Sequence, residues 1–318
     1  MGTKDWASFS KAKDCDDLNN YFEKRVYKHG KYCHYTKLSN IENILNKKIY
    51  ISCVNGFNDD CDKKQFGNGE AQKYFYALCF STGESENLAL WYLYSGVDGK
   101  GGRIQLTSKK IKKLIENSTY ELYEQDRETK NLIKPIIKLV QNDNMKLQFK
   151  DVLYYQEEEN KVRLKHNTMV INEFSLTEFQ KFKTQNKGFL KNIIWYYEKE
   201  IRLLIELVGE AKECIKADKN YVVVMSLPEK TDFIGFNIVL APEISEEIYW
   251  DIVCDKKYEN IRNLIKETSR LKLSDHSGQI HMDICGKCSI KNELEEEKKK
   301  CANCKEKKEL TKNYNSII

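Results

Sequence analysis

The chain has 318 residues, of which 41% are hydrophobic and 32% charged, and its formal net charge is +5. This length allows a sizeable buried core, in one large domain or two smaller ones. No apolar run approaches the roughly 20 residues that a membrane-spanning helix needs, and the N-terminus lacks the apolar core of a secretory signal. The sequence therefore predicts a cytoplasmic protein with no membrane partner. The modest positive charge does not by itself indicate nucleic-acid binding.

Short strands and helices alternate along the chain, which predicts an α+β fold with a mixed or antiparallel sheet core and flanking helices. Ser39 and Glu42 have the spacing of a capping box, which predicts a helix over 39–48. A turn-rich stretch at 55–62 and a helix over 87–95 are also expected. The strands expected in this part of the chain are 49–54, 74–80 and 103–107.

The clearest strand in the second half is 200–207, because its aliphatic residues alternate with Glu200, Arg202 and Glu206. A second capping box, Ser175 with Glu178, predicts a helical region that runs, with a break near Gly188, to about residue 197. The pattern of 109–144 is mostly helical. Further strands are expected at 152–155, 221–227 and 233–240, and a further helix at 245–268.

Four cysteines near the C-terminus form two Cys-x-x-Cys pairs, Cys285 with Cys288 and Cys301 with Cys304. Two such pairs supply the four thiolates of a closed tetrahedral zinc site, which is structural because no position stays open for water. The short charged spacer cannot form a core of its own, so zinc must stabilise this segment. The alternative is a set of unrelated surface cysteines. The sequence thus predicts an N-terminal extension at 1–30, a main domain at 31–270 and a zinc-binding module at 271–318.

Several patches in the main domain recur in a familiar order. They are Cys33-His34-Tyr35-Thr36, Ile44-Leu45, Ile49-Tyr50-Ile51-Ser52, Gly56-Phe57-Asn58-Asp59, Leu78-Cys79-Phe80-Ser81, Leu90-Trp91-x-x-Tyr94 and Trp195-Tyr196-Tyr197-Glu198-Lys199-Glu200-Ile201-Arg202. Together they resemble the bacterial family catalogued as domain of unknown function 2971, over roughly residues 31–242. The chain departs from the family pattern at Asp60, where proline is usual, and at 98–102. The family name carries no function.

His34-Tyr35-Thr36, followed by a short helix, also resembles the opening of the ADP-ribosyltransferase fold. In that superfamily a His-x-Thr element on the first strand holds NAD, and a glutamate on a later strand completes the site. The resemblance gives this second role to Glu198 or Glu200. It also implies that His34 and Thr36 hold the ribose and that Tyr50 or Tyr94 stacks on nicotinamide. The residues expected to bind NAD are His34, Tyr35, Thr36, Tyr50, Phe57, Asn58, Asp59, Trp91, Tyr94 and Arg202.

The chemistry of such a transfer explains why carboxylates are needed. Cleaving nicotinamide from ribose passes through an oxocarbenium-like transition state, as in glycoside hydrolysis. A carboxylate on the ribose 2′-hydroxyl stabilises the developing positive charge. In this interpretation Glu200, Glu198 and His34 are the catalytic residues, with one glutamate holding ribose and the other positioning an acceptor.

Each of these residues also has a structural interpretation. His34 is flanked by aromatic residues and can be an ordinary buried histidine. Glu198 and Glu200 can pair with Arg202 or Lys199. The segment 57–59 can be a turn whose side chains cap the backbone, and Trp91 and Tyr94 can be core residues.

Two hypotheses about function follow. The first is an NAD-dependent ADP-ribosyltransferase-like enzyme, a bacterial toxin or defence effector, which modifies an unidentified protein or nucleic acid and whose zinc module contacts the target or a partner. The alternative is a non-enzymatic module that binds a nucleotide, a nucleic acid or a protein. A metal-independent nuclease or hydrolase built on His34 is the weakest interpretation.

Overall fold

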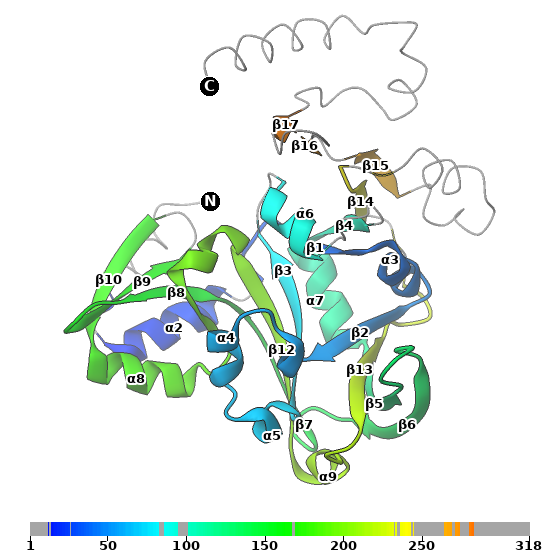
Figure 1. The fold of residues 1–318 in the computed structure, drawn as a ribbon, viewed down its shortest axis with the longest axis horizontal. Helices are drawn as coiled ribbons and strands as arrows, with labels where there is room; N and C mark the ends of the chain where they lie inside the picture. Colours follow the sequence, from blue (N-terminus) through cyan, green and yellow to red (C-terminus); the bar gives the residue numbers. More distant parts are fainter. Residues whose placement is uncertain are drawn as a thin grey trace, which may run out of the picture. The chain divides into compact units, whose positions relative to one another are not determined.

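The computed structural model describes residues 12, 14–25, 27–82, 86–94, 101–166, 169–231, 233, 236–242, 244, 264–268, 271–273 and 280–282. The chain forms two compact units that interleave along the sequence. Unit 1 contains residues 1–32, 47–82 and 107–231, and unit 2 contains 33–46, 83–106 and 232–318. Both combine sheets with helices, and most neighbouring strands are antiparallel, so the predicted α+β class is confirmed (Figure 1).

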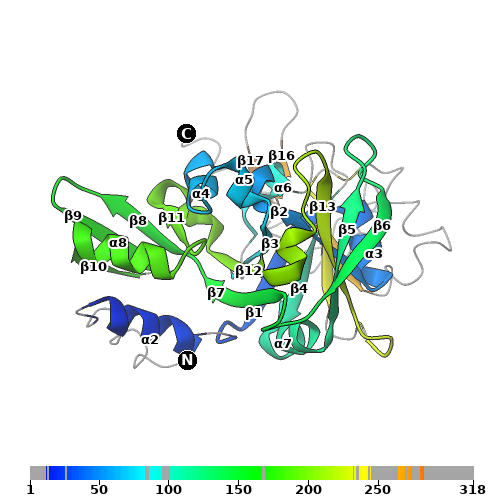
Figure 2. The same ribbon diagram turned by 90° about the horizontal axis from the view of Figure 1, so that it is seen from below.

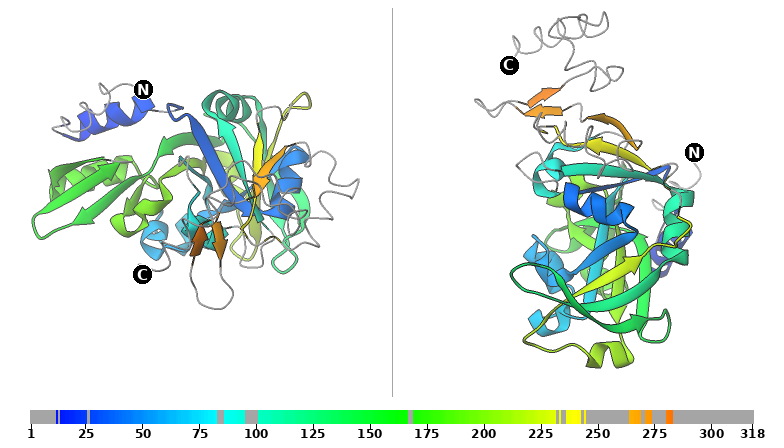
Figure 3. Two further views of the ribbon diagram at one scale, coloured as in Figure 1. Left: turned by 90° about the horizontal axis from the view of Figure 1, so that it is seen from above. Right: turned by 90° about the vertical axis from the view of Figure 1, so that its right-hand side faces the viewer.

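The main sheet of unit 1 is antiparallel throughout its described strands. In spatial order the strands are β7 (Met145–Asp151), β12 (Glu200–Leu207), β3 (Phe75–Ser81), β2 (Lys48–Cys53), β13 (Asn220–Ser226), β5 (Thr119–Gln125) and β6 (Leu132–Leu139). The β5–β6 hairpin lies at one edge of this sheet (Figure 3). The short elements η1 (Val54–Gly56), α4 (Asp60–Lys64), α5 (Gly69–Gln72) and α9 (Gly209–Glu213), and the longer helix α7 (Ser108–Asn117), connect the strands.

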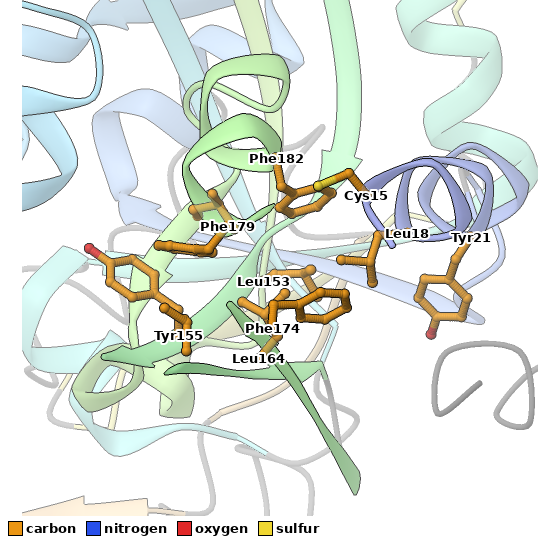
Figure 4. Packing of buried hydrophobic residues seen from close by; sticks show 11 residues of the cluster. Cys15, Leu18, Tyr21, Leu153, Tyr155, Leu164, Phe174, Phe179 and Phe182 are labelled. Carbon is orange, nitrogen blue, oxygen red and sulfur yellow. The ribbon is translucent and has the colours of Figure 1, made fainter. Parts of the chain in front are cut away.

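A second, smaller sheet of unit 1 lies against two helices (Figure 2). Its strands, in order, are β10 (Met169–Ser175), β9 (Lys161–His166), β8 (Leu153–Glu157) and β11 (Leu190–Asn192). Alternate residues of β8 and β9, such as Leu153 and Leu164, face helices α2 (Cys15–Arg25) and α8 (Leu176–Gln185), where they pack on Leu18 and Phe182 (Figure 4). Helix α2, within the segment expected to be an extension, is thus part of the core of unit 1.

Unit 2 contains most of β1 (Lys31–Lys37), which is followed directly by α3 (Leu38–Leu45). Its strands, in order, are β1, β4 (Gly101–Thr107), β14 (Asn237–Leu240) and β15 (Ile265–Thr268). Helix α6 (Leu88–Tyr94) precedes β4, and β16 (Leu271–Leu273) pairs with β17 (Ile280–Met282).

The two predicted capping boxes have different outcomes. The box of Ser175 and Glu178 is confirmed, because Ser175 Oγ accepts from the Glu178 backbone N–H at 3.2 Å and Glu178 Oε2 accepts from the Ser175 N–H at 3.2 Å. The box of Ser39 and Glu42 is wrong. Helix α3 starts one residue earlier, with Lys37 at the cap and no side-chain hydrogen bond. The strand β1 continues directly into the helix, so tertiary packing sets this helix start.

The expectation of a mostly helical 109–144 is wrong after α7 ends at Asn117. The hairpin β5–β6 follows, since Tyr120, Leu122 and Glu124 alternate with more exposed residues and so line one buried face. The helical region expected from Ser175 is found in part: α8 ends at Gln185, the break around Gly188 contains the short strand β11, and the 3-10 helix η2 (Ile193–Glu198) follows. The helix expected at 245–268 lies outside the described residues except at its end, where 265–268 is strand β15.

Candidate functional site

Glu198, Glu200 and Arg202 surround a sharp change of direction in unit 1. Ile193–Glu198 form the 3-10 helix η2, which Asn192 caps by accepting the N–H of Ile194 at 3.1 Å. Lys199 ends η2 in the left-handed region, with φ +44° and ψ +51°, and β12 begins at Glu200. Because of this turn, Glu198 and Glu200 are not neighbours on one extended strand.

Arg202 is the centre of a buried network of charges. Its guanidinium binds Asp62 in a bidentate manner, with Nη1–Oδ1 and Nη2–Oδ2 distances of 3.0 and 2.7 Å. Its Nε donates to Glu200 Oε1 at 2.8 Å, and Nη1 also donates to the carbonyl of Gly188 at 2.6 Å. The Arg202 side chain is 1% exposed, so these acceptors take the place of water.

The backbone at Gly188 is part of this arrangement. Gly188 has φ +82°, and a Cβ atom there would lie 2.6 Å from the ring of Phe66. Glycine is therefore required both by the left-handed backbone and by the close approach of the ring. Its carbonyl is thereby fixed as an acceptor for Arg202, and the ring of Phe57 covers the guanidinium at 4.8 Å.

Lys191 joins the two glutamates of the network. Its Nζ lies 2.6 Å from Glu198 Oε2 and 3.4 Å from Glu200 Oε2. The same Nζ lies 4.7 Å from the ring centroid of Trp195, which favours a cation–π contact. The backbone N–H of Glu200 donates to Tyr154 Oη at 2.7 Å. We call Asp62, Lys191, Glu198, Glu200 and Arg202 the charge cluster.

The electrostatics of the charge cluster keep Glu200 ionised. Burial by itself raises the pKa of Glu200, but Arg202 and Lys191 outweigh it and lower the pKa to about 2. Burial raises the pKa of Asp62 in spite of Arg202, which is consistent with three carboxyls facing two cations. Of the two carboxyls bonded to Arg202, Asp62 is therefore the one that takes up a proton first as the pH falls.

The arrangement holds four elements of unit 1 together. Both oxygens of Asp62 and both oxygens of Glu200 accept hydrogen bonds or ion pairs within unit 1. A carboxylate occupied in this way must lose a partner before it can bind a ligand. The chemistry that the cluster performs as it stands is structural: it fixes α4, β11, η2 and β12 relative to one another.

The segment from Ile194 to Arg202 combines partly exposed apolar side chains with buried charged ones. Ile194 is 70% exposed, and Trp195, Tyr196 and Tyr197 are only half-buried, whereas the charge cluster lies in the interior. The ring centroids of Trp195 and Tyr197 are 6.0 Å apart, and Lys165 Nζ lies 3.7 Å from that of Tyr196. We call Ile194–Tyr197 with Lys165 the aromatic face.

The residues expected to hold NAD are divided between the two units. His34, Tyr35 and Thr36 lie on β1 in unit 2, with His34 half-buried. Thr36 is buried, and its Oγ1 accepts from Asn40 Nδ2 at 2.8 Å. The bonds of the charge cluster described above join Glu198, Glu200 and Arg202 to one another and to other residues of unit 1.

The other expected residues have mainly packing or capping contacts. Trp91 is buried on α6 with its ring 4.9 Å from that of Tyr35, while Tyr94 is exposed at the end of the same helix. Tyr50 is half-buried on β2, and Asn58 is exposed. Asp59 caps α4, since its Oδ1 accepts from the Cys61 N–H at 2.9 Å.

A second buried polar group was not expected from the sequence. Asp151 accepts from His29 Nε2 at 2.8 Å and His166 Nε2 at 2.7 Å, and Tyr21 Oη lies 3.0 Å from His166 Nδ1. Burial raises the pKa of Asp151, but the hydrogen bonds from the two histidines lower it well below its usual range. Asp62 and Lys191 were missed as well. For Asp62, the one signal in the sequence was its place in the acidic segment 59–62. Nothing in the sequence around Lys191 indicated its role.

The four cysteines expected to bind zinc lie outside the described residues. Among the residues that the structure does describe, no group of three or more histidine, cysteine or acidic side chains is placed to hold a metal ion. No helix in that part of the chain is long and apolar enough to cross a membrane. Comparisons of the chain with family models, with curated proteins and with solved structures found no match.

Proposed function

We propose that the protein is a non-enzymatic binding module that holds single-stranded nucleic acid on the aromatic face of η2. The observation that carries the proposal is that Ile194 is exposed and the three following rings are partly exposed, whereas Glu198, Glu200 and Arg202 are buried. Burying charges costs free energy. A buried charge cluster next to partly exposed rings therefore needs a reason beyond folding. A rigid support for a stacking surface is such a reason.

The chemistry of the aromatic face suits nucleobases and phosphates together. Stacking of a base on an aromatic side chain contributes about 1–3 kcal/mol and tolerates any base sequence. Lys165 is half-buried beside Tyr196 and places a positive charge next to a ring. Because few lysines adjoin the rings, the dependence of affinity on salt concentration should be shallow.

Binding is measured by fluorescence anisotropy with a labelled 20-nucleotide single strand. A variant that combines Trp195→Ala with Tyr197→Ala should bind at least tenfold more weakly, because two stacking partners are lost. Tyr92→Ala is the matched control, since Tyr92 is an exposed aromatic residue of α6 in unit 2. Absence of saturable binding by the wild type, or equal affinity of the double variant, refutes the proposal. If the same rings bind a protein and not the single strand, the ligand is a protein and the nucleic-acid proposal is wrong.

The NAD-dependent ADP-ribosyltransferase is the second candidate, and one observation favours it. Glu200 stays ionised, as the reaction requires, and its Oε2 contacts Lys191 at the longer distance of 3.4 Å. A ribose 2′-hydroxyl would have to displace that contact. Incubation with labelled NAD and cell extract tests this candidate. Release of nicotinamide by the wild type that Glu200→Gln abolishes would favour the enzyme, and no release by the wild type excludes it.

A further inference from the structure

Arg103 in unit 2 is buried without the partners that a buried arginine needs. It lies on β4, a strand with β1 and β14 as its neighbours, and it is 2% exposed. Its Nη1 donates to Tyr35 Oη at a long 3.4 Å, and its Nε has no hydrogen-bond acceptor among the described residues. None of the carboxylates in the described part of the chain lies within 4.0 Å of its guanidinium.

Arg202 provides the comparison within the same chain. It is equally buried, yet it binds two carboxylates and a carbonyl. An uncompensated buried charge is strongly unfavourable. Burial lowers the pKa of Arg103, but Tyr35, Cys33 and Glu86 outweigh it and raise the pKa, so the guanidinium stays charged. Arg103 therefore lacks an acceptor that Arg202 has.

Tyr35 lacks an acceptor in the same place. Its oxygen accepts from the Asn87 backbone N–H at 3.1 Å and from Arg103, and both of these groups can only donate. A phenol that accepts twice still has its own hydrogen to donate. Among the described residues nothing accepts that hydrogen. Two donors, Arg103 Nε–H and Tyr35 O–H, thus lack acceptors at one position.

Glu86, the carboxyl that helps to raise the pKa of Arg103, is already engaged. Glu86 Oε2 accepts from Trp91 Nε1 at 3.1 Å, and Glu86 interacts with Arg103 only at longer range. His34 and Thr36 project from the other face of β1, because side chains alternate along a strand. The two unsatisfied donors therefore lie on the opposite face of β1 from His34 and Thr36.

We infer that Arg103 and Tyr35 form a binding site for a tetrahedral oxyanion of the phosphate class, free or as a phosphate ester. A guanidinium recognises phosphate through parallel N–H donors, and the phenol hydrogen supplies a third hydrogen bond. The carboxylate of Glu86 opposes an anion, so the affinity for free phosphate should be modest, in the millimolar range.

The site is tested with the full-length protein by isothermal titration calorimetry at constant ionic strength. The ligands are inorganic phosphate, AMP, adenosine and acetate. Phosphate and AMP should bind saturably, whereas adenosine and acetate should not. Tighter binding of AMP than of phosphate identifies an ester as the better ligand, and binding of acetate alone overturns the assignment to phosphate.

Variants locate the site. Arg103→Met and Arg103→Lys should weaken phosphate binding at least tenfold, because neither side chain offers a forked donor, and Tyr35→Phe should weaken it several-fold. Arg127→Met is the matched control, since Arg127 is an exposed arginine that donates to the carbonyl of Asp218 at 2.7 Å. No saturable binding by the wild type up to about 20 mM, tenfold above the expected range, overturns the inference whether or not the variants fold. Undiminished binding by folded Tyr35→Phe and Arg103→Lys overturns it too.

Discussion

Replacing Arg202 with methionine measures how strongly the charge cluster stabilises unit 1. The substitution keeps most of the apolar stem but removes the two bonds to Asp62, the bond to Glu200 and the bond to Gly188. Asp62 and Glu200 then remain buried, with Lys191 as the one cation left in the cluster. Removing one partner of a buried ion pair typically costs about 3–5 kcal/mol. For a chain of this size, such a loss lowers the melting temperature by roughly 10 °C.

The assay is urea unfolding followed by circular dichroism at pH 7. Arg163→Met is the matched control, because Arg163 makes surface ion pairs with Glu158 and Glu173 and is 38% exposed. Surface pairs contribute about 0–1 kcal/mol, so this variant should unfold almost as the wild type does. The loss of unfolding free energy in Arg202→Met, relative to the wild type, should be smaller at pH 5, because Asp62 and Glu200 can take up protons once Arg202 is gone. The reasoning is refuted if the free energy of unfolding of Arg202→Met at pH 7 lies within about 1 kcal/mol of the wild-type value, since a surface ion pair can contribute that much.

The buried carboxyls and the cysteine pairs give three more expected outcomes. Glu200→Gln should lower the free energy of unfolding by roughly 3 kcal/mol at pH 7, because the lowered pKa of Glu200 contributes stability that is fully present above the unfolded pKa of 4.5. Urea unfolding should find that this loss fades as the pH falls from 4.5 towards 2. A loss that persists unchanged at pH 2 contradicts the assignment. Asp151→Asn should lower the free energy of unfolding by about 3 kcal/mol, because the hydrogen bonds from two histidines are weakened. An unchanged thermal midpoint would argue against a structural role of Asp151. Elemental analysis should find one zinc ion per chain, and Cys301→Ser should lower this zinc content. A chelator that unfolds the entire protein in one transition would contradict an appended zinc module.

The aromatic face and the oxyanion site are independent of each other. The first lies in unit 1 and the second in unit 2. Loss of nucleic-acid binding in the Trp195 and Tyr197 double variant should therefore leave phosphate binding intact. Conversely, Arg103→Lys should leave the binding of the 20-nucleotide strand intact. A protein in which both activities fall together would have a single shared site.

Local signals predicted the elements that are governed by local chemistry. The capping box at Ser175 is confirmed because its two hydrogen bonds involve residues three apart. The strand 200–207 is confirmed because its alternation reflects packing on both sides of one backbone. The prediction of a mostly helical 109–144 is wrong after residue 117, because the pairing of β5 with β13 and β6 stabilises a hairpin there.

The sequence by itself determined that Glu198, Glu200 and Arg202 belong together, and it left open whether they catalyse or pair. Only the tertiary structure decided what surrounds them. Asp62 lies 140 residues from Arg202 in the chain, and Lys191 meets two glutamates only because η2 ends in a left-handed turn. The energy of a charge depends on its distance from water and from other charges. Residue order specifies neither distance, so folding alone turned a charged motif into a buried clamp.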